Sequence, residues 1–140
     1  MKKIIFLFVC LFAFSCSYSQ WNSLYYNNII DIEAIDFYSF KLGFAVGESS
    51  FNPYILRTNN GGHKWDTVYT NSSSMIYKDV CMLDSSKVVA VGHKVNSTGG
   101  IISLTLDKGA TWQHTSFNYN LHKVIFTSFN LGYILTYDGI

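Results

Sequence analysis

The sequence repeats with a period of about 45 residues, and this period limits the possible folds more than any other feature. Segment 35–37 (IDF) matches 80–82 (VCM) and 124–126 (VIF), at offsets of 45 and 44 residues. Segment 43–47 (GFAVG) matches 88–92 (VVAVG), again at an offset of 45 residues. A repeat of this length is one supersecondary unit that buries its apolar residues by packing against the next unit. We therefore treat the chain as a repeat protein.

Each repeat contains four short strand patterns separated by turn residues, and no stretch after Gln20 has sustained helical periodicity. Four strands in 40 to 50 residues is the period of a β-propeller blade. We predict an all-β chain with about two and a half four-stranded antiparallel blades. The expected strands are 29–37, 44–48, 54–58, 64–69, 76–82, 88–94, 100–105, 111–115, 121–126 and 133–137.

The predicted organisation follows the repeats. A partial propeller covers 20–140, with blade repeats at about 29–72 and 73–120 and an incomplete one at 121–140. Trp21 lies 44 residues before Trp65, so segment 20–26 is read as the outer strand of a further blade. Closed propellers have roughly four to eight blades. We expect the chain to be an N-terminal piece of a longer propeller. Such a piece would self-associate through its exposed blade faces.

An eight-residue box recurs in the first two repeats, at 58–65 and 105–112. Its pattern is Thr-x-Asp/Asn-x-Gly-x-Thr/Lys-Trp, which suits a hairpin turn. We expect the Asp or Asn to accept from backbone amides two residues on, and the glycine to take a positive φ. The tryptophan is expected to bury its ring and keep an indole donor for a carbonyl. The predicted structural residues are Thr58, Asn60, Gly62, Trp65, Thr105, Asp107, Gly109 and Trp112.

The box resembles the Asp-box, also called the bacterial neuraminidase repeat, with Asn60 in place of the usual Asp. Together with segments 42–47 (LGFAVG) and 55–58 (ILRT), it resembles the photosystem II assembly/stability-factor-like propeller family, over residues 21–140. The resemblance implies a propeller fold and, in photosynthetic members, a role in assembly. Related repeats also occur in secreted bacterial proteins, and nothing in this sequence indicates photosynthesis.

The first 19 residues read as a secretory signal peptide. Lys2 and Lys3 precede eleven apolar residues, and small serines lead to a cleavage site before Gln20. Eleven helical residues span only about 16 Å, too short to cross a membrane. Segment 13–16 (AFSC) also resembles a loose lipobox, so a lipid anchor at Cys16 is the alternative. We expect a secreted or cell-surface protein without a transmembrane segment.

The charge balance and the arginine content exclude two classes of function. Lys and Arg number 10 against 9 Asp and Glu, which gives no basis for binding nucleic acid. Sialidase chemistry needs several arginines around the substrate carboxylate, whereas Arg57 is the only arginine. A propeller glycoside hydrolase stays open, because acidic residues lie on or near the innermost strands. These candidates are Asp31, Glu33, Asp36, Asp79 and Asp138.

A second candidate site consists of Glu33, Lys78 and His122, which occupy equivalent repeat positions. On innermost strands they would form a rim at one end of a central channel, or else polar strand ends facing water. His63, His93, His114 and His122 lack metal-ligand spacing, and Cys81 is the only cysteine after Gln20. We predict no cofactor, no metal and no catalytic residue.

The sequence thus favours an exported bacterial propeller that acts as a non-catalytic binding or assembly scaffold, with a protein or carbohydrate ligand left open. The alternative is the N-terminal part of a secreted propeller glycoside hydrolase.

Overall fold

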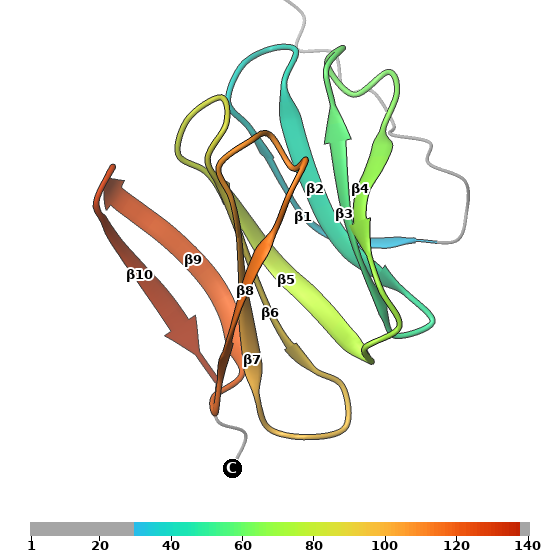
Figure 1. Ribbon diagram of the computed structural model, residues 1–140, viewed down its shortest axis with the longest axis vertical. Coiled ribbons are helices and arrows are strands. Elements are labelled where there is room, and N and C mark those ends of the chain that lie inside the picture. Colours follow the sequence, from blue (N-terminus) through green and yellow to red (C-terminus); the bar gives the residue numbers. More distant parts are fainter. Residues whose placement is uncertain (1–29, 138–140) are drawn as a thin grey trace, which may run out of the picture.

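The computed structural model describes residues 30–137, and within them the chain forms ten strands and no helix (Figure 1). The all-β prediction is therefore confirmed. The segments 1–19 and 20–26, with Cys16 and Trp21, and also Asp138 lie outside the described residues. The strands are β1 (Asp31–Phe37), β2 (Gly43–Ser49), β3 (Asn52–Thr58), β4 (Asp66–Thr70), β5 (Met75–Met82), β6 (Val88–Lys94), β7 (Gly100–Thr105), β8 (Gln113–Phe117), β9 (Leu121–Ser128) and β10 (Leu131–Thr136).

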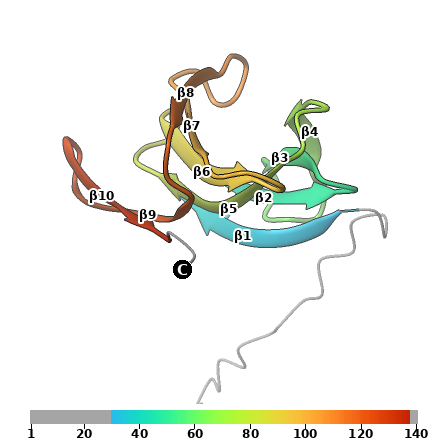
Figure 2. The same cartoon turned by 90° about the horizontal axis from the view of Figure 1, so that it is seen from below.

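The strands form three antiparallel sheets in chain order. The first sheet has the order β1-β2-β3-β4, the second has β5-β6-β7-β8, and β9 pairs with β10 in a two-stranded hairpin. The prediction of four-stranded antiparallel sheets is confirmed for the first two repeats. The sheets do not close into a ring within residues 30–137. Figure 2 shows β1, β5 and β9 side by side, with β4 and β8 on the opposite side of the row.

Each sheet turns the same repeat positions toward the next sheet. Phe44 and Val46 on β2 are fully buried in a core shared with the second sheet. Val89 and Val91, 45 residues later, belong to a second core that includes Leu121 of the hairpin. The intervening alanines point the other way, so Ala90 faces the first sheet. Strand alternation fixes this arrangement, because a shift of one residue would exchange the two faces.

The outer face of the hairpin carries the same repeat positions, and within residues 30–137 no further sheet packs against it. Ile125, Tyr133 and Leu135 on this face are 56%, 57% and 64% exposed. Tyr133 and Leu135 follow Val89 and Val91 by 44 residues. The expectation that such a face mediates self-association stays a prediction.

A polar chain runs through the interface between the first two sheets. The Tyr77 hydroxyl bonds the hydroxyl of Ser103, which is fully buried, and that hydroxyl also lies 2.8 Å from His114 Nδ1. The ring of Tyr69 on β4 lies 4.8 Å from the His114 ring and meets Tyr77 edge-on. Burial raises the pKa of Tyr77 and lowers that of His114, so both stay neutral near pH 7. These bonds satisfy the hydroxyl groups of the buried Tyr77 and Ser103, while His114 lies at the surface.

Candidate functional site on the first strands of the sheets

The first strand of each sheet (β1, β5 and β9) contains a β-bulge, and the bulged residues are Glu33, Lys78 and His122. The pairing of β1 with β2 passes from Ile32 to Ala34, which leaves Glu33 without an opposite residue. The pairing of β5 with β6 skips Lys78 in the same way, and that of β9 with β10 skips His122. A bulge re-aims the side chain of its extra residue. Three ionisable side chains are thereby redirected at the same repeat position.

A glycine lies opposite two of the three bulges, because no side chain fits there. A Cβ atom on Gly47 would lie 1.9 Å from the carbonyl oxygen of Asp31. A Cβ atom on Gly92 would lie 2.1 Å from the carbonyl oxygen of Ile76. These backbone atoms cannot move aside without breaking the strand pairing. The third repeat has Thr136 at the corresponding position.

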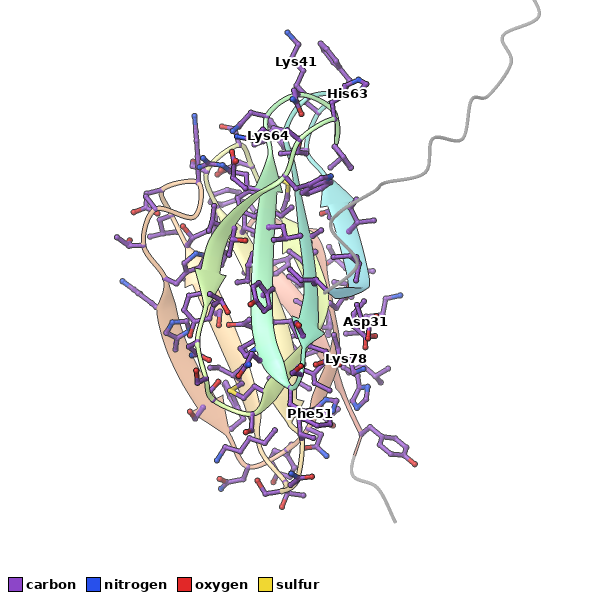
Figure 3. The ribbon with its side chains drawn as sticks, turned by 90° about the vertical axis from the view of Figure 1, so that its right-hand side faces the viewer. Asp31, Lys41, Phe51, His63, Lys64 and Lys78 are labelled. Atoms are coloured by element: carbon purple, nitrogen blue, oxygen red, sulfur yellow. The ribbon has the colours of Figure 1, made fainter. Side chains whose placement is uncertain are left out.

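The structure brings two of the predicted rim residues into contact. Lys78 Nζ lies 2.7 Å from Glu33 Oε1, across the junction between the first and second sheets. The side chains are 24% and 34% exposed respectively. A pair this accessible contributes about 0 to 1 kcal/mol to folding. Its charges therefore remain available to a ligand. Figure 3 places Lys78 near Asp31, in the half of the molecule that lies away from Lys64.

His122 contacts two aromatic side chains that the sequence analysis did not assign to the site. Its ring stacks on His93 of β6 at 4.9 Å, and Tyr137 meets it edge-on at 5.7 Å. Burial lowers the pKa of His93, and the charges of His122 and Lys78 lower it further. His93 directly follows Gly92, which opposes the Lys78 bulge. The position of His93 next to this glycine is the signal in the sequence that could have identified it as a site residue.

The carboxylates proposed for glycoside hydrolysis have other partners. Asp36 Oδ2 accepts the backbone N–H of Met82 on β5 at 2.7 Å. Asp79 Oδ2 accepts the N–H of Val124 on β9 at 2.9 Å. Asp36 thus joins β1 to β5 and Asp79 joins β5 to β9, while Glu33 pairs with Lys78. Asp31 is exposed at the beginning of β1.

The two boxes form the same hydrogen-bonded turn. Thr58 Oγ1 accepts from the Gly62 N–H at 2.9 Å, and Thr105 Oγ1 accepts from the Gly109 N–H at 2.9 Å. Both glycines have a positive φ, 88° and 84°. The acidic or amide side chain bonds the amide four residues on, not two as expected, because the turn carries it past the intervening glycine. Lys64 N lies 2.9 Å from Asn60 Oδ1, and Thr111 N lies 2.9 Å from Asp107 Oδ1.

The box side chains differ from expectation in one further respect. Trp65 is 7% exposed, and the ring of Trp112 packs edge-on against Phe44 of the preceding sheet at 6.3 Å. The buried indole N–H groups of both tryptophans have no hydrogen-bond partner within residues 30–137, whereas we expected a carbonyl. The bonds from Thr111 and Thr105 lower the pKa of Asp107 to about 2. The second box is thus a hydrogen-bonded turn that holds an ionised carboxylate, whereas the first box has the neutral Asn60 at this position.

The arginine and cysteine side chains outside the site take part in packing and hydrogen bonding between repeats. Arg57 Nη1 donates to the carbonyl oxygen of Lys108 in the next box at 2.8 Å. Burial raises the pKa of Cys81, and nearby Asp36 raises it further, which keeps the thiol protonated. Among residues 30–137, no group of three or more His, Cys, Asp and Glu side chains is placed to hold a metal ion. The same residues contain no helix long and apolar enough to cross a membrane.

Comparison with protein-family models, with curated proteins and with solved structures gives no significant match. The function has to be inferred from the repeat geometry and from the bulged residues.

Proposed function

We propose that the chain is an exported β-propeller segment that acts as a non-catalytic binding and assembly scaffold. The two four-stranded sheets and the hairpin would be successive blades, with β1, β5 and β9 as their innermost strands. The repeated face polarity supports this, because Phe44 and Val46 face the next sheet as Val89 and Val91 do. The ligand-binding surface would be the bulge row, which we define as Glu33, Lys78 and His122.

The single observation that carries the binding role is the placement of all three residues on bulges of consecutive innermost strands. The row offers a carboxylate, an ammonium and an imidazole with aromatic neighbours, a combination that suits a polar ligand with both donors and acceptors. Hydrolysis would need two carboxyl groups that flank the scissile glycosidic bond. Asp36 and Asp79 instead bond backbone amides of the neighbouring strand, which favours binding over hydrolysis.

A binding test compares the exported chain with a triple variant, Glu33→Gln, Lys78→Met and His122→Gln. Both are applied to arrays of defined oligosaccharides and of synthetic peptides. The control variant is Lys64→Met with Asp66→Asn, which removes the ion pair at 2.8 Å that includes Lys64, at the other end of the molecule. We expect at least one ligand class to bind the wild type and the control but not the triple variant. Equal binding by all three proteins would refute the bulge row.

Two further measurements test catalysis and export. Chromogenic glycosides should remain intact with the wild-type chain, and hydrolysis lost on Asp36→Asn or Asp79→Asn would establish the enzyme instead.

Mass spectrometry of the mature N-terminus should give Gln20, while an acylated Cys16 would identify a lipid-anchored form. A chain that keeps Met1 after expression in a secreting host would contradict export.

A further inference from the structure

The hydrogen-bonded side chains of Tyr77, Ser103 and His114 connect the junction of the first two sheets with solvent. The hydroxyl groups belong to Tyr77 of β5 and Ser103 of β7, which are 1% and 0% exposed. His114 of β8 lies opposite Ser103 in the strand pairing and is exposed. A proton taken up from solvent by His114 therefore acts directly on two buried hydroxyl groups. These three residues belong neither to the bulge row nor to the boxes.

The three side chains have room for two protons between them. One proton lies between the two hydroxyl oxygens, and the other lies between Ser103 Oγ and His114 Nδ1, which are 2.8 Å apart. The hydroxyl protons of Tyr77 and Ser103 fill both places when His114 Nδ1 is an acceptor. The neutral imidazole then carries its own proton on Nε2. The hydrogen bonding thus selects one tautomer of His114.

Protonation of His114 brings a third proton to these two places. An imidazolium donates from both ring nitrogens, so Nδ1 then donates to Ser103 Oγ. One hydroxyl proton, that of Ser103 or that of Tyr77, loses its acceptor. Within residues 30–137, the hydroxyl groups of both residues bond only each other and His114. A buried donor without a partner destabilises the folded state.

The remaining neighbours of His114 do not compensate for this lost bond. Tyr69 of β4 faces His114 at a ring distance of 4.8 Å, and its hydroxyl oxygen accepts from Asn71 Nδ2. An aromatic ring at an exposed site attracts a cation only weakly. Among the described residues, His114 takes part in no ion pair. Burial lowers the pKa of His114, in agreement with a folded state that opposes the imidazolium.

We propose that Tyr77, Ser103 and His114 form a pH-sensitive switch that loosens the junction between the first two sheets in acid. The rings of Tyr77 and Tyr69 pack there with Phe44, so a hydrogen bond lost by Tyr77 is lost inside this contact. The pKa of His114 lies below the ordinary histidine value of 6.5, so the unfolded chain binds the proton more readily. The stabilisation is complete well above pH 6.5 and is lost as the pH falls below it.

Nuclear magnetic resonance of the imidazole ring tests the hydrogen bonding directly. In the wild type, we expect the neutral His114 ring to carry its proton on Nε2. Ser103→Ala should raise the pKa of His114 by at least about 0.5, a roughly threefold change in proton affinity. Tyr69→Phe keeps the ring beside His114 and should leave this pKa unchanged. A neutral ring protonated on Nδ1 would overturn the proposal, as would equal pKa values in the wild type and Ser103→Ala.

Thermal unfolding tests the effect on stability. His114→Gln retains an acceptor oxygen and cannot titrate. Between pH 7.5 and pH 5, the melting temperature of the wild type should fall by at least about 3 °C more than that of His114→Gln. The matched control is His63→Gln, which removes a histidine outside the switch and should follow the wild type. Parallel curves for the wild type and His114→Gln would refute the switch, even if Ser103→Ala does not fold.

Hydrogen exchange locates the loosening. After correction for the intrinsic effect of pH on exchange, the β5 and β7 amides of the wild type should lose at least about fivefold more protection than those of His114→Gln between pH 7.5 and pH 5. The amides of β9 and β10 should change equally in the two proteins. Excess exchange spread evenly over all strands would contradict a switch at this junction.

Discussion

Asp36 on β1 accepts the backbone N–H of Met82 on β5 at 2.7 Å, so that a side chain of the first sheet completes the hydrogen bonding of the second. Asp79 repeats this arrangement toward Val124 of the hairpin at 2.9 Å. The two carboxylates come from different repeat positions, but both join the first strands of consecutive sheets. Cohesion between sheets therefore combines apolar packing with directional bonds.

Replacing Asp36 should test this bond directly. Asp36→Ala leaves the Met82 N–H without its partner, and we expect a loss of about 1 to 3 kcal/mol in the free energy of unfolding. Asp36→Asn retains an acceptor oxygen and should lose less. Urea denaturation measures both, with Asp31→Ala, an exposed carboxylate on the same strand, as the control. Equal midpoints for Asp31→Ala and Asp36→Ala would show that the bond contributes nothing.

The hydroxyl pair of Tyr77 and Ser103 should be energetically coupled. Ser103→Ala leaves the buried Tyr77 hydroxyl and His114 Nδ1 without the Ser103 hydroxyl, at a cost of about 1 to 3 kcal/mol. In the Ser103→Ala variant, the further change Tyr77→Phe should lower the free energy of unfolding by less than it does in the wild type, because the partner hydroxyl is already absent. A double-mutant cycle should give a coupling energy of at least about 0.5 kcal/mol. Strict additivity would mean that the two hydroxyls act independently.

The glycines opposite the bulges should tolerate no side chain. Gly47→Ala forces a Cβ against the carbonyl oxygen of Asp31, and we expect a loss of about 3 kcal/mol or an unfolded chain. Gly132→Ala is the control, because the three atoms nearest to its Cβ all belong to the Phe126 ring, a side chain that can rotate away. Thermal unfolding followed by circular dichroism distinguishes them. A Gly47→Ala protein as stable as Gly132→Ala would contradict the bulge geometry.

Acid should weaken the second box through Asp107. Its pKa in the folded chain, about 2, lies below the ordinary value of 3.8, so the unfolded chain binds the proton more readily. The stabilisation is complete above about pH 4 and is lost as the pH falls toward 2. The variant Asp107→Asn copies the residue of the first box and cannot titrate. The difference in melting temperature between the two proteins should therefore shrink or reverse between pH 5 and pH 2, and a constant difference would exclude this role.

The sequence was sufficient to predict the strands, because the hydrophobic pattern and the turn residues repeat locally. The repeat offsets alone also showed that Glu33, Lys78 and His122 occupy equivalent positions. It could not identify them as bulged residues, since a bulge depends on the register between two strands. Nor could it find the Asp36 bond, whose partner lies 46 residues away on another sheet.

The stacking of His93 on His122 was missed for a related reason. The two residues belong to different repeats and meet only because β6 and β9 pack together. In the boxes, composition indicated a turn, but the choice of amide depended on the path of the backbone. Local chemistry was thus easier to predict than contacts between repeats.

The repeated orientation of the strand faces gives the row of sheets a direction. The side of a sheet that carries Phe44 or Val89 differs from the side that carries Ala45 or Ala90, so two like sides do not meet at these junctions. Whole repeats can be added at an end of such a row without any change in the residues that pack between the existing sheets. Gene duplication could therefore lengthen this architecture while leaving every existing junction intact.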